Sequence, residues 1–453
     1  MKFVVLRRWS VLALAVLAAA AMFSTRAAWA QRLGREIIPQ SEALRHGLTR
    51  AWVTQVELDR SRGRIAHVSL EDGLLMVQTD QATIQVMDAE TRRTLWIAHI
   101  GRPNYPVTPP AANDRFVVTS NGAHLYLFDR ATGRLVWEKR LDGVPSAGVA
   151  ISHNRAYVPL TSGVVMSYLL PDLKEDELVD PLEKLLKDQP LVYQGKGMAE
   201  SAPIVTSTNV VWATSGGNVY SVTPEDLAAR FKFSARDAIS APLSYRTPFV
   251  YAASRDGYVY AIREQRGYAS WKFSSGNPVV EQPVVIGDSL FLIPETGGLF
   301  RLSVETGVEQ WSVRGIYHFV AASPTRLYTV DLLGRLVILD AQSGARLGSL
   351  ETSALDLKLS NDQTDRIYLG TRTGLIQCLH EVQLSEPVIH RARPPAPVAA
   401  EEPVEGEEPE TDEPAVEEPE AEMEEPADAA DDAADPFDEP AEEAGVEDEA
   451  EAE

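Results

Sequence analysis

Cysteine is nearly absent from this sequence: its 453 residues contain only one, Cys378. A single thiol cannot form a disulfide within the chain, so the fold must be held together by core burial alone. Cys378 lies near the end of the repeated part of the chain, and we interpret it as a small buried strand residue.

Motifs for metal binding and catalysis are also missing. The eight histidines are dispersed, no pair has zinc-ligand spacing, and there is no phosphate-binding glycine loop. Cys378 and His380 are two residues apart and would share one face of a strand, but a Cys-His nucleophile would still need an oxyanion site. We therefore predict no catalytic, cofactor-binding or metal-binding residues and no enzymatic activity.

Basic residues are missing from the C-terminal part of the chain. Residues 401–453 hold 27 Asp and Glu and no Lys or Arg; without them the net charge of −24 becomes +3. Removing the four basic residues of the first 30 as well leaves about −1. A near-neutral domain with a polyanionic extension is not expected to bind nucleic acid.

The same acidic segment buries too little apolar surface to offset its chain entropy. We therefore predict that residues 391–453, rich in Pro, Ala, Glu and Asp, form a disordered acidic tail. Two functions remain open for it. It either contacts basic partners or divalent cations, or it serves as a solubilising spacer.

The first 30 residues have the pattern of a secretory signal peptide. A basic start precedes the apolar run Val11–Phe23, and a small-residue site predicts cleavage between Ala30 and Gln31. A retained membrane anchor is the alternative, although the run is short for a membrane span. No cysteine lies near the site, so no lipid anchor is expected there. The predicted location is the periplasm or cell envelope, with a soluble protein after cleavage.

A repeat of about 41 residues dominates the rest of the chain. Trp137 follows Trp96 by 41 residues, and Trp311 follows Trp271 by 40. Seven of the eight copies have an aromatic strand residue followed by a turn glycine, and after the turn apolar residues alternate with polar ones. Short alternating strands without a long helix predict the blades of an all-β propeller. Eight copies predict eight blades, or seven if one copy is degenerate. The expected turn glycines are Gly122, Gly163, Gly217, Gly257, Gly298, Gly334 and Gly374, with Gln81 in the same place in the first copy.

The recurring tryptophans Trp96, Trp137, Trp271 and Trp311 are expected to join the blades. We predict that each indole lies flat between neighbouring blades, over the turn formed by a Thr-Gly segment. Carbohydrate stacking is the alternative, but the regular spacing favours a structural role.

The copies define the domain limits. Residues 31–50 form an N-terminal lead-in with a short helix around Ser41–Arg45, and residues 51–390 form the propeller. The last copy is one strand short, and we expect the alternating stretch Ala51–Leu58 to complete it. Residues 171–188 are an insertion with leucines at helical spacing. Its helix would either pack over its own blade or dock a partner.

The repeat resembles the tryptophan-docking repeat of pyrroloquinoline-quinone-type (PQQ-like) propellers. Its motif is AspArgAlaThrGlyArgLeuValTrp at 129–137, with variants at 303–311 and 340–347, and strands open with SerAlaPro at Ser201 and Ser240. Within this family, the quinoprotein dehydrogenases use two adjacent cysteines, a calcium ion and an Asp base. This chain has one cysteine and is more similar to the non-enzymatic BamB-like branch, from which it departs by lacking a lipid-attachment cysteine and by its acidic tail.

The resemblance implies an exported, non-catalytic scaffold for protein–protein interaction at the cell envelope, with outer-membrane protein assembly as the specific case. Its partners would be envelope proteins, including barrel-assembly components. The alternative is a propeller that binds a quinone or another small ligand in its central funnel.

Overall fold

The computed structural model describes residues 37–171 and 189–391. Three predictions fall outside these residues almost entirely. They are the signal peptide over 1–30, with cleavage between Ala30 and Gln31, the helical insertion over 171–188 and the acidic tail over 391–453. These remain predictions.

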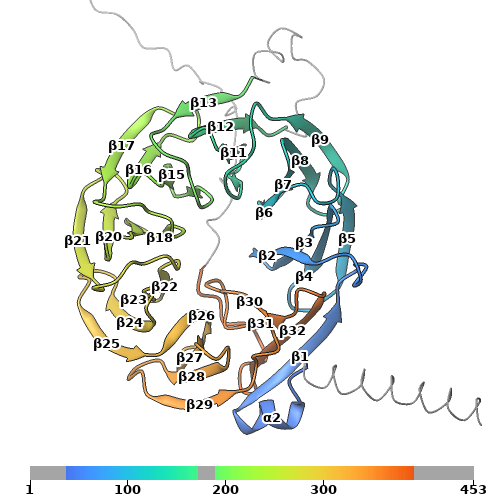
Figure 1. Ribbon diagram of the computed structural model, residues 1–453, viewed down its shortest axis with the longest axis vertical. Coiled ribbons are helices and arrows are strands. Elements are labelled where there is room, and N and C mark those ends of the chain that lie inside the picture. Colours follow the sequence, from blue (N-terminus) through green and yellow to red (C-terminus); the bar gives the residue numbers. More distant parts are fainter. Residues whose placement is uncertain (1–36, 172–188, 392–453) are drawn as a thin grey trace, which may run out of the picture. The chain divides into compact units, whose positions relative to one another are not determined.

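The described chain forms eight four-stranded antiparallel sheets set around a ring (Figure 1). In seven of them the strand order follows the chain, with the first strand toward the centre and the fourth on the outside. The all-β, eight-bladed propeller is therefore confirmed, and the seven-bladed alternative is wrong.

The strands of the first four blades have the following bounds: β2 (Ile65–Glu71), β3 (Leu74–Thr79), β4 (Thr83–Asp88), β5 (Thr94–His99); β6 (Val107–Ala112), β7 (Phe116–Asn121), β8 (His124–Asp129), β9 (Leu135–Arg140); β10 (Ala150–Ile151), β11 (Arg155–Pro159), β12 (Val164–Leu169), β13 (Leu191–Gln194); β14 (Ile204–Val205), β15 (Val210–Ala213), β16 (Asn218–Val222), β17 (Ala229–Ser234).

The last four blades consist of β18 (Ser244–Arg246), β19 (Phe249–Ala253), β20 (Tyr258–Arg263), β21 (Ala269–Ser274); β22 (Val284–Ile286), β23 (Ser289–Leu292), β24 (Gly298–Ser303), β25 (Glu309–Arg314); β26 (Ile316–Ala322), β27 (Arg326–Asp331), β28 (Leu336–Asp340), β29 (Arg346–Leu350); β30 (Leu357–Lys358), β31 (Ile367–Gly370), β32 (Leu375–Glu381), β1 (Leu48–Gln55).

Burial follows the position of each strand in its blade. Every residue of β3 and β7 is buried, because a second strand lies in the middle of its sheet and both of its faces pack against neighbouring blades. Along the outer strand β21, partly buried and exposed residues alternate, as expected for a strand with one face toward water. In the seven blades other than the first, the second strand carries the aromatic residue expected before the turn, and this residue is always buried: Phe116, Tyr157, Trp212, Tyr251, Phe291, Tyr328 and Tyr368.

The turns between second and third strands correct two of the expected positions. The residue with positive φ is Gly297 (φ 81°), whereas Gly298 begins β24. In the first blade it is Ala82 (φ 59°) rather than Gln81. In both blades the left-handed residue stands immediately before the third strand. The predicted positions, Gly298 and Gln81, were each wrong by one residue. The other six expected glycines do have positive φ.

The ring closes where the two ends of the fold meet. Strand β1 pairs with β32 from Leu48↔Glu381 to Gln55↔Leu375, so the N-terminal strand is the outer strand of the last blade. This closure was predicted, although β1 begins and ends three residues before the expected stretch 51–58. The short helix was also predicted, and α2 (Gln40–Arg45) precedes β1 directly.

The blades present two rims. The first rim carries the turns between second and third strands and the loops that join successive blades. The second rim carries the turns between first and second strands and those between third and fourth strands. Because Leu48 pairs with Glu381, α2 and the residues after Glu381 lie at the second rim.

Candidate functional site: blade junctions and ring closure

Tryptophans from outer strands contact the next blade at the second rim. Trp96 donates from Nε1 to the carbonyl of Arg130 at 2.8 Å, and a Cβ on Gly133 would lie 2.5 Å from the indole. Trp271 donates in the same way to Val304 at 3.0 Å and lies against Gly307. The glycine of each turn has no side chain, and this lets the ring rest directly on the backbone.

The other two expected tryptophans differ in their contacts. Trp311 lies over Gly344, where an added Cβ would come 2.8 Å from the ring, but its buried Nε1 has no hydrogen-bond partner among the described residues. Trp137 packs against Tyr168, with ring centroids 6.5 Å apart. Most of the segment between β12 and β13, where the other blades have the turn that a tryptophan contacts, lies outside the described residues.

Two aromatic residues that the sequence analysis did not name hold the same position. Trp52 in β1 donates from Nε1 to Ala89 at 3.1 Å across the closing junction. Phe231 in β17 lies against Gly267. Trp52 could have been found from the sequence, since it lies within the stretch expected to complete the last blade.

The junction between the seventh and eighth blades has a glycine in the tryptophan position. Gly348 pairs with Ile338 as Trp311 pairs with Arg301 in the blade before. A Cβ on Gly348 would lie 2.7 Å from Nδ1 of His46, and Arg326 donates to the carbonyl of His46 at 2.9 Å. In the last blade no turn joins the third strand β32 to the fourth strand β1, because the two come from opposite ends of the fold. The residues after α2 occupy the position that a docking side chain has at the other junctions.

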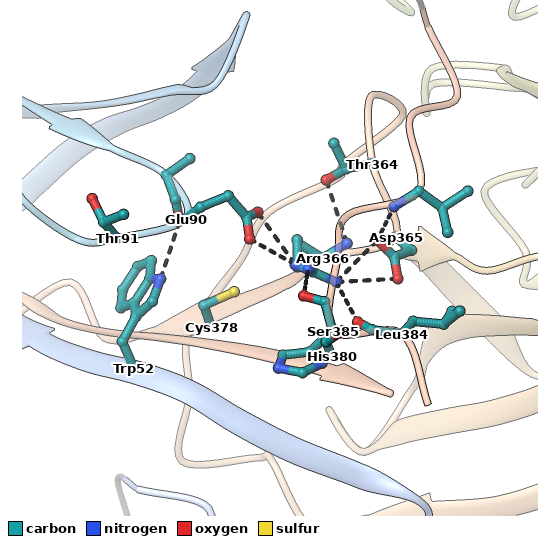
Figure 2. A network of polar contacts seen from close by, with 12 residues as sticks. Trp52, Glu90, Thr91, Thr364, Asp365, Arg366, Cys378, His380, Leu384 and Ser385 are labelled. Atoms are coloured by element: carbon teal, nitrogen blue, oxygen red, sulfur yellow. Dashed lines mark hydrogen bonds and ion pairs between the residues drawn. The ribbon is translucent and has the colours of Figure 1, made fainter. Parts of the chain in front are cut away.

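A buried arginine joins the last blade to the first (Figure 2). The side chain of Arg366 is 1% exposed and contacts the carboxylates of Asp365 at 3.2 Å and Glu90 at 3.0 Å. It also donates to the carbonyls of Leu384 at 3.1 Å and Ser385 at 2.7 Å. One guanidinium thus ties together the first blade, the last blade and the segment that follows β32.

The rest of the segment after β32 contacts the turn between β30 and β31, which contains Asp365 and Gln363. Asp365 accepts from the amide of Val388 at 2.9 Å, and His390 contacts the carbonyl of Ala322 in the seventh blade at 2.7 Å. Gln363 donates to Leu70 in the first blade at 2.6 Å. The turn between β30 and β31 and the C-terminal segment 382–391 therefore together connect the first, seventh and eighth blades.

Chemistry at Cys378 is not supported by its surroundings. The thiol is 1% exposed, and burial raises its pKa well above the usual range. His380 uses Nδ1 to contact the carbonyl of Glu381 at 2.8 Å. A protonated, buried thiol is a poor nucleophile. Within the described ranges, no group of three or more His, Cys, Asp or Glu is placed to hold a metal ion.

A buried carboxylate links the fourth and fifth blades. Glu264 is 3% exposed and accepts hydrogen bonds from Tyr245 at 2.7 Å and from the hydroxyl of Thr208 at 2.9 Å. Thr206 and Ser207 donate to it as well. Burial alone would raise the pKa of Glu264, but the hydrogen bonds from Thr206, Tyr245 and Thr208 outweigh it and lower the pKa. Neutral donors, four hydroxyl groups and the backbone amide of Thr208 at 3.2 Å, thus stabilise this charge, as no ion pair reaches Glu264 from the part of the chain that the structure describes.

Among the described residues, no helix has the length and apolar character needed to cross a membrane.

Comparisons with known proteins agree with this architecture. The family model described as outer membrane protein assembly factor BamB matches residues 24–172 and 209–367, more than half of the chain. The outer membrane protein assembly factor BamB of Shewanella oneidensis is 20% identical over 295 residues, which are 58% of this chain and 70% of that protein.

Two solved structures show the same fold. BamB from Moraxella catarrhalis has a TM-score of 0.58 at 15% identity, covering 74% of this chain and 99% of that one. The computationally designed Ika8 protein has a TM-score of 0.56 at 16% identity, covering 72% and 98%. At such identities the likeness is one of fold alone.

Proposed function

Because this chain belongs to the family described as outer membrane protein assembly factor BamB, we propose that it is an exported, non-catalytic scaffold that binds other proteins at the cell envelope. The observation that carries the proposal is the family match over both halves of the propeller. Its specific role would be in outer-membrane protein assembly, in the periplasm, with barrel-assembly components among its partners.

The polar groups inside the ring support a structural rather than a catalytic use. Arg366 and Glu264, both nearly inaccessible to water, bind groups of neighbouring blades. The tryptophans Trp96 and Trp271 are likewise engaged with the turns of the next blade. These contacts leave the loops of the two rims as the surfaces for partners. The turn glycines and docking tryptophans would hold those loops in place.

Crosslinking and co-purification from envelope fractions test the proposal. The full chain is compared with a chain that ends at Arg393, since the acidic tail is a separate candidate for recruitment. We expect the same envelope proteins with both forms, barrel-assembly components among them. Partners that appear only with the full chain and disappear in high salt would assign recruitment to the tail instead.

Titration with pyrroloquinoline quinone and calcium provides the matching negative control. A scaffold gives no saturable heat of binding with either. Stoichiometric binding of the quinone would contradict the proposal and favour a ligand-binding propeller.

A further inference from the structure

A small pocket opens on the second rim of the fifth blade, with a volume of about 280 Å³. Pro248, in the turn between β18 and β19, forms one wall. Arg263 at the end of β20 and Gln265, Arg266 and Tyr268 in the following turn form the rest. None of the five lining residues is acidic.

The two arginines of the pocket are not engaged with carboxylates. No ion pair of Arg263 or Arg266 is found within residues 37–171 and 189–391. Arg263 is oriented by a hydrogen bond from Nε to Ser270 at 3.2 Å and by the ring of Phe249, 5.3 Å from its guanidinium carbon. Its two terminal nitrogens remain available for a planar anionic group. Tyr268, 48% exposed, adds an accessible ring.

The backbone around the pocket is held in place from behind. Arg263 accepts from the amide of Gly267 at 2.8 Å and donates to the carbonyl of Tyr268 at 2.9 Å, which closes the turn. The amide of Glu264 donates to Pro248 at 3.0 Å, joining the two walls. The Glu264 carboxylate accepts hydrogen bonds from Thr206 and Thr208 of the fourth blade and from Tyr245 of its own blade, and it anchors the turn on its buried side. A backbone already fixed in this way loses little conformational entropy when the pocket binds a partner.

We propose that this pocket binds a carboxylate side chain in an acidic segment of a partner protein. Guanidinium groups pair with carboxylates through two parallel hydrogen bonds, and two arginines with one amide donor suit a negative group. The volume of about 280 Å³ lies at the lower limit of the usual range for small-molecule sites, about 300–1,000 Å³, and suits one or two side chains. Pro248 and Tyr268 would contact the apolar part of the segment. The proposal rests on the scaffold function and names the chemistry of its partner.

Calorimetric titration of the full chain with an oligoglutamate of about ten residues tests the site. The pocket variant carries Arg263→Gln and Arg266→Gln. The control variant carries Arg230→Gln and Arg236→Gln, which remove the same charge from exposed positions of the fourth blade. We expect saturable binding to the wild type, a loss of about 30-fold or more in the pocket variant and less than about threefold in the control.

Three results would overturn the proposal: no binding to the wild type, equal losses in both variants, or tighter binding of inorganic phosphate than of oligoglutamate. Equal losses would mean that only net charge matters, and the phosphate result would assign the pocket to phosphate groups. The envelope crosslinking experiment separates this failure from failure of the scaffold function. Partners recovered with a wild type that does not bind oligoglutamate would leave the scaffold function standing without this pocket.

Discussion

The closing junction, between the last and first blades, and the junction between the fourth and fifth blades each contain a buried charged side chain. The two side chains lie at corresponding turns of the repeat, but their charges are opposite. At the closure, Arg366 in the turn between first and second strands contacts Glu90 in the turn between the third and fourth strands of the next blade, here called the outer turn. Between the fourth and fifth blades, Glu264 in the outer turn reaches back to Thr206 and Thr208 of the blade before. One junction pairs a cation with carboxylates, and the other surrounds an anion with hydroxyls.

The chain itself explains this difference. The fourth and fifth blades are covalently consecutive, so neutral donors suffice to fix their contact. The first and last blades meet only when distant parts of the chain come together, at an entropic cost that grows with loop length. Arg366 binds Glu90, which is 276 residues away, together with groups of its own blade and of the segment after β32, and a buried guanidinium left without them would be strongly destabilising. We therefore expect the contacts between the first and last blades to form and open as one unit, which we do not expect of the junction between the fourth and fifth blades.

The largest expected effect comes from Arg366→Met. It leaves Asp365, 2% exposed, and Glu90 without their cation, and should lower the free energy of unfolding by about 3–5 kcal/mol in urea titrations. Reaction of Cys378 with a thiol reagent should speed up, because the closing blade opens more often. The control Arg335→Met removes the cation of a more exposed pair with Asp331 and should cost about 1 kcal/mol or less. Equal losses would mean that the closure has no special role.

The next effect is expected at a docking tryptophan. Trp271→Ala removes an indole that packs on Gly307 and donates to Val304, and should cost about 3 kcal/mol. Trp271→Phe keeps most of the buried ring and should cost clearly less. Thermal unfolding followed by circular dichroism measures both. A Phe variant as unstable as the Ala variant would show that the hydrogen bond, not the packing, matters.

A smaller effect, dependent on pH, is expected for Glu264→Gln. The amide cannot accept from all the hydroxyls that surround the carboxylate, so the variant should lose about 1–2 kcal/mol at neutral pH. The pKa of Glu264 is lowered below its usual 4.5 in the folded state, so the stabilisation by the ionised form is complete above about 4.5. It disappears as the pH falls through the folded-state pKa. Urea titrations from pH 7 to pH 3 should show the two proteins converging, and a constant difference would contradict the assignment.

The smallest effect is expected at the junction that lacks a tryptophan. Gly348→Ala forces the ring of His46 to move and should cost about 1 kcal/mol. His46→Ala should remove most of that penalty when the two changes are combined, which a double-mutant cycle measures. Additive losses would show that the segment after α2 does not fill this position.

Local patterns were enough to predict much of the architecture. The repeat, its eight copies and the PQQ-like, BamB-like resemblance are confirmed by the sheets and by the family match. Alternation over residues 51–58 predicted the closing strand because strand periodicity is readable within a few residues. The adjacent glycines Gly297 and Gly298 were harder to separate, because either one satisfies a tight turn and only the register of β24 decides.

The sequence by itself determined which segments become strands and how many blades they form, since these follow from period-two alternation and turn residues close along the chain. Only the tertiary structure decided which polar side chains would meet. Arg366 and Glu90 are 276 residues apart, and Gly348 meets His46 across most of the chain. Such pairs leave no local pattern, because their partners come together only after the ring has closed and excluded water from between its blades.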